Sequence, residues 1–175
     1  MAVYTKINKS NLKSINRKFN FENFQSFKGI KQGIENTNYL LRSKNKKFIL
    51  TIFEKRVVKK EIPFFMKLMD QLSNLNINCP KPLKNNQGNY LIKVKNKISC
   101  VVTFLDGKDK KKLNLKNCFD IGKTIAQIHL STKKLKLYRK NSMGIKNLNP
   151  LLNSIKFKSQ KFSNLEKFLK NNFKD

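Results

Sequence analysis

The sequence is poor in several residue types, and each shortage excludes a class of protein. Among 175 residues there is no tryptophan, one histidine and three cysteines, with none of the spacings of a zinc finger. No apolar run approaches the roughly 18 residues that a membrane-spanning helix needs, and the opening Met-Ala-Val-Tyr-Thr-Lys lacks the apolar core of a signal peptide. We therefore expect a cytoplasmic protein of one domain or two small lobes.

Acidic residues are also scarce. Ten Asp and Glu stand against 39 Lys and Arg, which gives a formal net charge of +29. Such a charge attracts polyphosphates, so a basic nucleic-acid-binding module is one interpretation. However, the lysines are spread over every segment, alanine occurs twice, and asparagine is abundant. Because no RNA-binding motif accompanies the charge, we favour compositional drift, and nucleic acid is not an expected partner.

The cysteines are too far apart to form a metal-binding pair. Cys79, Cys100 and Cys118 each lie among apolar neighbours, and their number is odd. We expect buried, reduced thiols.

The first half of the chain has the pattern of three consecutive strands. Residues 24–31, 35–42 and 47–54 are the expected strands, and the third is apolar on both faces, as in a central strand. A short helix capped by Ser10 precedes them.

Helical and extended patterns alternate further along the chain. The apolar spacing of residues 59–75 predicts a helix, and residues 89–94 and 97–104 predict two more strands. Five antiparallel strands with a helix after the third indicate an α+β fold, the small lobe of a kinase-like protein.

The polar stretch from Gly107 to Lys112 marks the expected domain boundary, which divides the chain into lobes 1–106 and 107–175. Beyond it, a helix capped by Asn114 runs to Leu130, and a second helix starts with the capping box Ser163 to Glu166. These would be the first helices of an incomplete, mainly α-helical large lobe.

Several motifs together resemble the choline/aminoglycoside phosphotransferase-like kinases, and among them the homoserine kinase branch. The elements shared broadly with the superfamily are Cys79-Pro80-Lys81-Pro82 and Gly122-x3-Ala126-x2-His129. Those resembling the homoserine kinase branch are Glu35-Asn36-x-Asn38 and Thr51-x-Phe53-Glu54-Lys55-Arg56. The resemblance also covers the segments 26–30, 63–65 and 102–107.

This resemblance implies ATP-dependent phosphorylation of the L-homoserine hydroxyl, a step of threonine biosynthesis, with ATP and Mg²⁺ as cofactors. Another small-molecule alcohol or amino-sugar kinase of the same superfamily is the alternative. Phosphoryl transfer depends mostly on positioning and on stabilisation of charge.

The chain departs from the family in one respect. The family has a His-x-Asp catalytic loop and a later metal-binding Asp, whereas the single histidine here, His129, is followed by Leu130-Ser131. The catalytic Asp and the metal ligands are therefore expected beyond residue 175, and we expect these 175 residues alone to be inactive. His129 itself is interpreted as a packed helix residue.

The resemblance also implies where ATP binds, beginning with the first turn. Backbone N–H groups of Gly29 and Gly33 would approach the phosphates, with Asn36 ordering the turn; an ordinary hairpin loop and a strand-end cap are the alternatives. Thr51 stands where the third strand usually presents a lysine. Lys55 is then the phosphate-contacting candidate, paired with Glu61 of the next helix, unless it is a solvated strand-end lysine.

The remaining site residues form the expected hinge between the lobes. There the backbone of Thr103, Phe104 and Leu105 would pair with adenine. A plain edge strand would have the same side-chain pattern.

Overall fold

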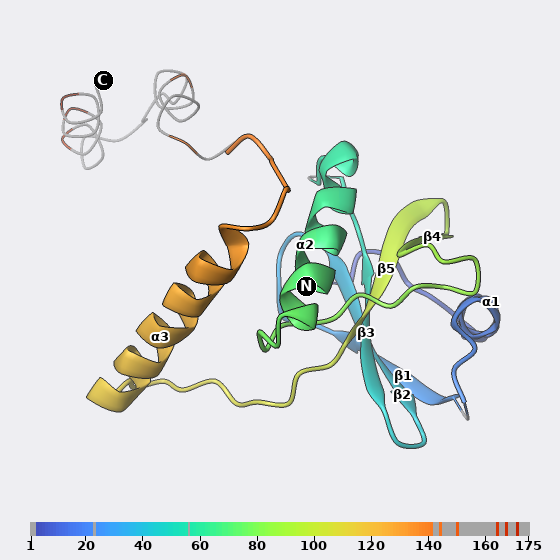
Figure 1. Cartoon of the computed structure of the whole chain (residues 1–175). Helices are drawn as coiled ribbons and strands as arrows, with labels where there is room; N and C mark the ends of the chain where they lie inside the picture. Colours follow the sequence, from blue (N-terminus) through green and yellow to red (C-terminus); the bar gives the residue numbers. More distant parts are fainter. Residues whose placement is uncertain are drawn as a thin grey trace. The chain divides into compact units, whose positions relative to one another are not determined.

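The computed structural model describes residues 3–22, 24–55 and 57–141, together with the single positions 144, 150, 164, 167 and 171. Its contacts divide the chain into two compact units, Met1–Leu137 and Tyr138–Asp175. The first unit holds an antiparallel sheet of five strands in the order β1-β2-β3-β5-β4 (Figure 1). The strands are β1 Phe24–Ile30, β2 Thr37–Ser43, β3 Lys47–Ile52, β4 Leu91–Val94 and β5 Lys97–Thr103. The helices are α1 Lys9–Phe19, the 3₁₀ turn Lys59–Glu61, α2 Ile62–Asn74 and α3 Leu115–Thr132.

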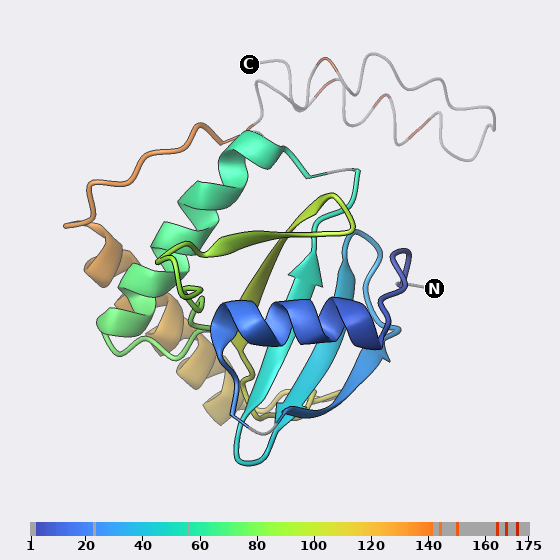
Figure 2. The same cartoon turned by 90° about the vertical axis from the view of Figure 1, so that its right-hand side faces the viewer.

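Helix α1 covers one face of the sheet (Figure 2). It buries Leu12 and Ile15 against the strand residues Tyr39, Leu41 and Leu50, and the last two are fully inaccessible. Burial of such aliphatic side chains stabilises a fold by about 1.5–3 kcal/mol each. This face holds the larger part of the core.

Helix α2 covers the opposite face. Ile62 and Met66 pack on Cys100 and Val102 of β5, with Ile49 of β3 beside them. Because successive residues of a strand point to opposite faces, β3 and β5 contribute to both apolar clusters. The expected fold, a five-stranded antiparallel sheet with a helix inserted after the third strand, is confirmed.

The N-terminal cap of α1 corrects the sequence prediction. The cap is Asn8, whose side chain accepts from the N–H of Asn11 at 3.0 Å while Asn11 reaches back to the N–H of Asn8 at 3.1 Å. Ser10, the predicted cap, lies inside the helix. A reciprocal Asn–Asn box satisfies two N–H groups, whereas a serine cap satisfies one.

Strand β3 is shorter than the sequence predicts. It ends at Ile52 because the N–H of Glu54 leaves the ladder and donates to the side chain of Asn36 at 3.3 Å. Strand β4 likewise begins at Leu91, since the N–H of Asn89 is held by Asn85 Oδ1 at 2.9 Å in the preceding turn.

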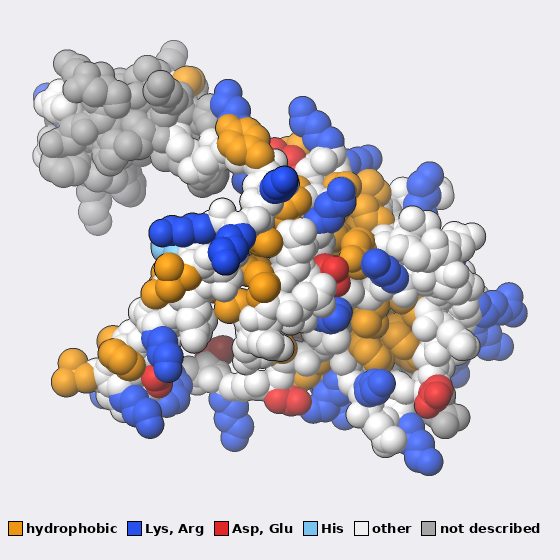
Figure 3. All heavy atoms as spheres, in the orientation of Figure 1, with side chains coloured by type: hydrophobic (Ala, Val, Ile, Leu, Met, Phe, Trp, Pro, Cys, Tyr) orange, Lys and Arg blue, Asp and Glu red, His pale blue; other side chains and the backbone are white. Residues whose placement is uncertain are grey.

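Helix α3 begins at the predicted cap, Asn114, which forms a second box with Asn117. None of its residues is buried: Leu115 is 90% and Phe119 is 70% exposed, although α3 contacts α2. Hydrophobic and lysine side chains are visible over it in Figure 3. His129 is exposed, so its interpretation as a packed residue is wrong.

The segment 104–114 between β5 and α3 has no helix or strand, and the domain boundary near Gly107 stays a prediction. Most of the helix expected to start with the capping box Ser163 to Glu166 lies outside the described residues; of that stretch the structure describes only positions 164, 167 and 171, each of them helical. None of the helices in the described part is long and apolar enough to cross a membrane.

The three cysteines are free, as expected, but they differ in burial. Cys100 is buried and Cys79 is half-buried, whereas Cys118 is exposed on α3. The prediction that all three are buried is therefore wrong for Cys118, because the face of α3 that carries it is uncovered.

Candidate functional site

The turn between β1 and β2, residues 31–36, is largely exposed, and Ile34 at its tip is 74% accessible. Gly33 has a φ of +102°, a conformation that favours glycine, and no atom lies within 4 Å of the position of a Cβ. The turn therefore presents open backbone around Gly33.

Gly29 lies elsewhere. It is within β1, opposite Tyr39, and a Cβ on it would come within 3.0 Å of Val3 Cγ2. The close approach of Val3 gives Gly29 a packing reason to lack a side chain.

Thr51 faces the α2 side of the sheet. The register aligns Ile30, Asn38, Thr51 and Cys100 in one row across four strands, and Cys100 packs under α2. The Thr51 hydroxyl donates to Asn38 Oδ1 at 2.8 Å, and both side chains are half-buried. Thr51, which we predict to stand where kinases usually present a lysine, thus forms a neutral hydrogen-bonded pair with Asn38.

A lysine that sequence reasoning missed faces the same side. Lys28 of β1 aligns with Leu40, Ile49 and Val102 in the adjacent row, and it is exposed. Because Lys28 lies two residues before Ile30, the two side chains point to the same face of the strand, but only the strand register shows that this is the face of Thr51.

The predicted residues Lys55 and Glu61 lie outside the strands. Lys55 follows the end of β3 and is exposed, so the alternation that would place it on the face of Thr51 does not reach it. Glu61 is the half-buried residue that precedes α2. Their pairing stays a prediction.

Asn36 connects the turn to the end of β3 through its bond to the Glu54 N–H. The Glu54 carboxylate accepts from Thr5 and Thr37, each at 2.7 Å, and pairs with the Lys97 ammonium. Burial alone raises the pKa of this carboxyl, but these hydrogen bonds and the lysine charge outweigh it and hold the pKa below its ordinary value of 4.5. The side chain of Asn36 thus caps the end of β3, and the same hydrogen bond ties the turn to that strand end.

The predicted hinge begins where β5 ends. The N–H of Thr103 donates to the Lys81 carbonyl at 2.9 Å, and the N–H of Phe104 donates to the Lys47 carbonyl at 3.2 Å. The Lys47 ammonium pairs with Asp106 at 2.9 Å and lies 5.2 Å from the centroid of the Phe104 ring. The first two hinge N–H groups therefore hold the hinge to the lobe, and Leu105, 40% exposed, follows them.

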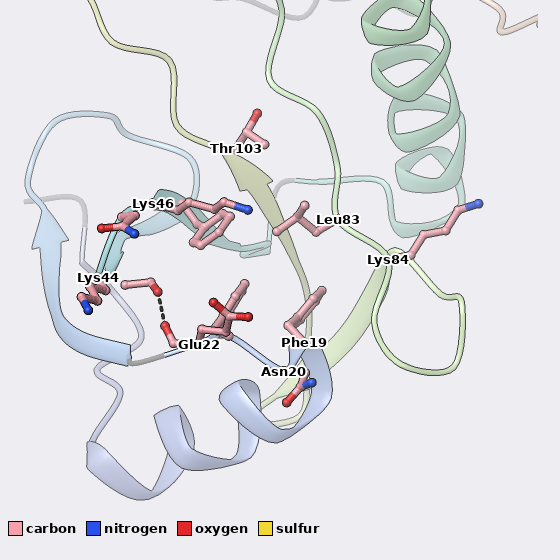
Figure 4. A pocket seen from close by; sticks show the side chains of 12 residues that line it. Phe19, Asn20, Glu22, Lys44, Lys46, Leu83, Lys84 and Thr103 are labelled. Carbon is pink, nitrogen blue, oxygen red and sulfur yellow. Dashed lines mark hydrogen bonds between the residues drawn. The ribbon is translucent and has the colours of Figure 1, made fainter.

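A hollow of about 520 Å³ opens near the start of this hinge (Figure 4). Phe19 and Leu83 point into it, while Lys84 points away toward the ring of Tyr90. The hollow includes Phe48, which belongs to the α1 face of the core, so it lies on the opposite side of the sheet from Thr51. It is separate from the row that carries Thr51, although Thr103 of the predicted hinge lines it.

Within the described residues, no group of three His, Cys, Asp or Glu side chains is placed to hold a metal ion. The Glu54 carboxylate, whose side chain is 10% exposed, already accepts from Thr5, Thr37 and Lys97. Among the described residues, Glu54 therefore does not fit the role of a Mg²⁺ ligand.

An exposed glycine turn and a five-stranded antiparallel sheet with a helix inserted after its third strand are typical of the small lobe of a kinase-like fold. Solved structures agree. A spectinomycin phosphotransferase in complex with ADP and spectinomycin matches with a TM-score of 0.60 and 13% identity, over 96% of this chain and 54% of that one. A microcompartment-associated aminopropanol kinase matches with a TM-score of 0.63 and 14% identity, over 83% and 49%.

The sequence comparison defines the family more closely. The model of the phosphotransferase enzyme family matches residues 26–155, and the chain belongs to this family. The homoserine kinase of Parvibaculum lavamentivorans is 34% identical over 154 residues, which are 88% of this chain and 48% of that protein. That of Bartonella tribocorum is 36% identical over 145 residues, 83% and 46%. The chain spans about half the length of the curated relatives it matches.

Proposed function

We propose that this chain is the nucleotide-binding part of an ATP-dependent kinase that phosphorylates the hydroxyl of L-homoserine in the cytoplasm. The observation that carries the proposal is the 34% identity to a homoserine kinase over 88% of the chain, combined with a sheet that leaves the Gly33 turn and Leu105 exposed. Phosphorylated homoserine would then serve threonine biosynthesis.

In this proposal ATP lies on the α2 face of the sheet, under the turn 31–36. Open backbone around Gly33 would donate to the phosphates, because successive N–H groups in a turn make an anion-binding concavity. Lys28 and Lys55 are the candidate cations. The Asn38–Thr51 pair would give the phosphates or the ribose a neutral, fixed partner.

The adenine would pair with hinge backbone beyond Phe104. The N–H groups of Thr103 and Phe104 already donate within the lobe, so the N–H of Leu105 is the candidate donor. Backbone recognition of this kind leaves the side chains of the hinge free to vary.

Magnesium and the general base belong, in this proposal, to residues that this chain does not include. Mg²⁺ would neutralise the charge that develops on the transferring phosphoryl group. The part of the chain seen here would bind and orient the nucleotide, and we propose that it does not transfer phosphate by itself.

The test has two stages. Calorimetry of the 175-residue chain should detect ATP and ADP binding, weakened by excess adenosine. A coupled assay of ADP release should then detect no homoserine-dependent turnover by this chain, whereas a longer protein that includes a His-x-Asp loop should prefer homoserine over threonine, choline and amino sugars. Absence of nucleotide binding, or a better rate with an amino sugar, would contradict the respective part of the proposal.

A further inference from the structure

The segment before α1 lies against the candidate phosphate-binding turn. Residues 3–7, called here the N-terminal segment, run beside β1 and β2. Val3 occupies the space left by the missing side chain of Gly29, and the N–H of Ile7 donates to the Tyr39 hydroxyl at 3.2 Å. The Tyr39 hydroxyl in turn donates to the Thr5 carbonyl at 2.9 Å. The segment is thus held at both ends.

Its middle residues bond to the turn directly. The Tyr4 hydroxyl donates to the Ile34 carbonyl at 2.9 Å, at the tip of the turn. The N–H groups of Tyr4 and Thr5 both donate to Thr37 Oγ1, each at 3.0 Å, where the turn enters β2. Thr37 is fully buried, so its hydroxyl is shielded from water.

A single carboxylate joins the segment to the rest of the sheet. Glu54 accepts from Thr5 and Thr37 on one oxygen and from Lys97 on the other, and Lys97 also donates to the Thr5 hydroxyl at 2.7 Å. The side chain of Glu54 is 10% exposed and that of Lys97 is 40% exposed. Charge-assisted hydrogen bonds of this kind are stronger than neutral ones.

The same residue also holds the turn from the other side, since the backbone N–H of Glu54 donates to Asn36. Three contacts therefore fix the turn. The Tyr4 hydroxyl binds the Ile34 carbonyl, and the Glu54 N–H binds the Asn36 side chain. Thr37 is held by the N–H of Tyr4 and by the Glu54 carboxylate. Gly33 directly precedes the first of these points, and a Cβ added to it would meet no atom within 4 Å.

We infer that Glu54 and Tyr4 are positioning residues, which use the N-terminal segment as a brace to hold the turn 31–36 in its phosphate-binding shape. The inference rests on the proposed function for the identity of the ligand. Neither side chain has to touch the nucleotide. A phosphate-binding turn that is ordered in advance loses less conformational entropy when ligand binds, so the brace raises affinity for the phosphates and leaves adenine recognition at the hinge unchanged.

The test uses two variants of the 175-residue chain with matched controls. Glu54→Gln removes the charge that gathers Thr5, Thr37 and Lys97, with the exposed Glu22→Gln as control. Tyr4→Phe removes only the bond to Ile34, with Tyr138→Phe as control, because Tyr138 is 89% exposed. Hydrogen exchange of the amides of residues 31–36 and the dissociation constants of ATP and adenosine are measured for all of them.

We expect faster exchange in the turn for both variants, and weaker ATP binding by about tenfold for Glu54→Gln and about threefold for Tyr4→Phe, with the adenosine constant within about twofold. If exchange in the turn is unchanged, or if adenosine weakens as much as ATP, the inference is wrong. If Glu54→Gln unfolds, the result for Tyr4→Phe decides. If hydrogen exchange in the turn becomes faster in the variants but the parent chain binds no ATP, the role of Glu54 and Tyr4 in holding the turn is supported and the proposed function is wrong.

Discussion

The hydroxyl of Thr51 donates a 2.8 Å hydrogen bond to Asn38 Oδ1 across the neighbouring strands β3 and β2. Both residues lie on the α2 face, in the row that continues to Cys100. A lysine at position 51 would bring a positive charge to this face of the sheet, whereas Thr51 and Asn38 form an uncharged hydrogen-bonded pair.

Removal of the Thr51 hydroxyl should therefore destabilise the lobe modestly. Thr51→Val leaves a half-buried amide oxygen without its donor, and we expect a loss of about 1–2 kcal/mol in the free energy of unfolding, measured by urea denaturation. Thr51→Ser keeps the hydroxyl and should therefore retain most of the stability of the parent chain. Thr124→Val, which removes an exposed hydroxyl bond on α3, should change stability by less than about 0.5 kcal/mol. Equal losses for Thr51→Val and Thr124→Val would contradict the role of the pair.

Adenine recognition should depend on one backbone group of the hinge. Leu105→Pro removes the N–H that we assign to adenine, and we expect the dissociation constant of ATP to rise about tenfold or more while the melting temperature changes little. Leu113→Pro lies in the same segment without helix or strand and should leave affinity unchanged. Calorimetry measures both; unchanged binding by Leu105→Pro would move adenine away from this residue.

The two candidate lysines can be separated. Lys28 is on the α2 face of the sheet by register, whereas Lys55 follows the strand and borders a hollow of about 340 Å³ with Tyr4, Glu54 and Lys97. We expect Lys28→Met to weaken ATP binding more than Lys55→Met, by about threefold to tenfold, and to reduce its salt dependence. The reverse order would support Lys55, as the sequence predicts.

The stability of the lobe should depend on the ionisation of Glu54. Its folded-state pKa is lowered, so folding favours the charged carboxylate. The stabilisation is complete above the ordinary value of 4.5 and is lost as pH falls through the lower folded-state pKa. Urea denaturation from pH 6 to pH 3 should show a smaller loss of stability for Glu54→Gln than for the parent chain. Glu22→Gln should follow the parent; if all three curves are parallel, Glu54 contributes nothing to acid sensitivity.

The cysteines should react in the order of their exposure. Cys118 is exposed, whereas burial raises the pKa of the Cys79 thiol and raises that of Cys100 to about 12. Because the thiolate is the reactive form, a thiol reagent should label Cys118 first and Cys100 only on unfolding. Mass spectrometry of partly labelled protein gives the order. Rapid labelling in Cys118→Ser would show that a second thiol opens in the native state.

The fold was predictable because apolar residues alternate along the strands and recur at helical spacing in α2, and that pattern survives a strong lysine bias. The glycine motif correctly predicted the exposed turn at Gly33, whereas the hinge at residues 103–105 stays a prediction. The sequence did not reveal that Asn8 rather than Ser10 caps α1, because both residue types are good caps and only the backbone decides between them.

Interactions between distant residues were the least predictable part of the site. Glu54 gathers Thr5, Thr37 and Lys97, which lie 49, 17 and 43 residues away in sequence. Lys55 was assigned to a strand face by counting, but the strand ends three residues earlier. Lys28 was overlooked because its face depends on the pairing of β1 with β2.

The packing of Val3 against Gly29 has a practical consequence for handling the protein. A purification tag fused ahead of Met1 would be separated by only two residues from Val3, which packs against Gly29 of β1. A bulky or polyanionic tag there would disturb the packing of Val3 and compete with ATP at the turn where we propose that its phosphates bind, so affinities should be measured after the tag is cleaved.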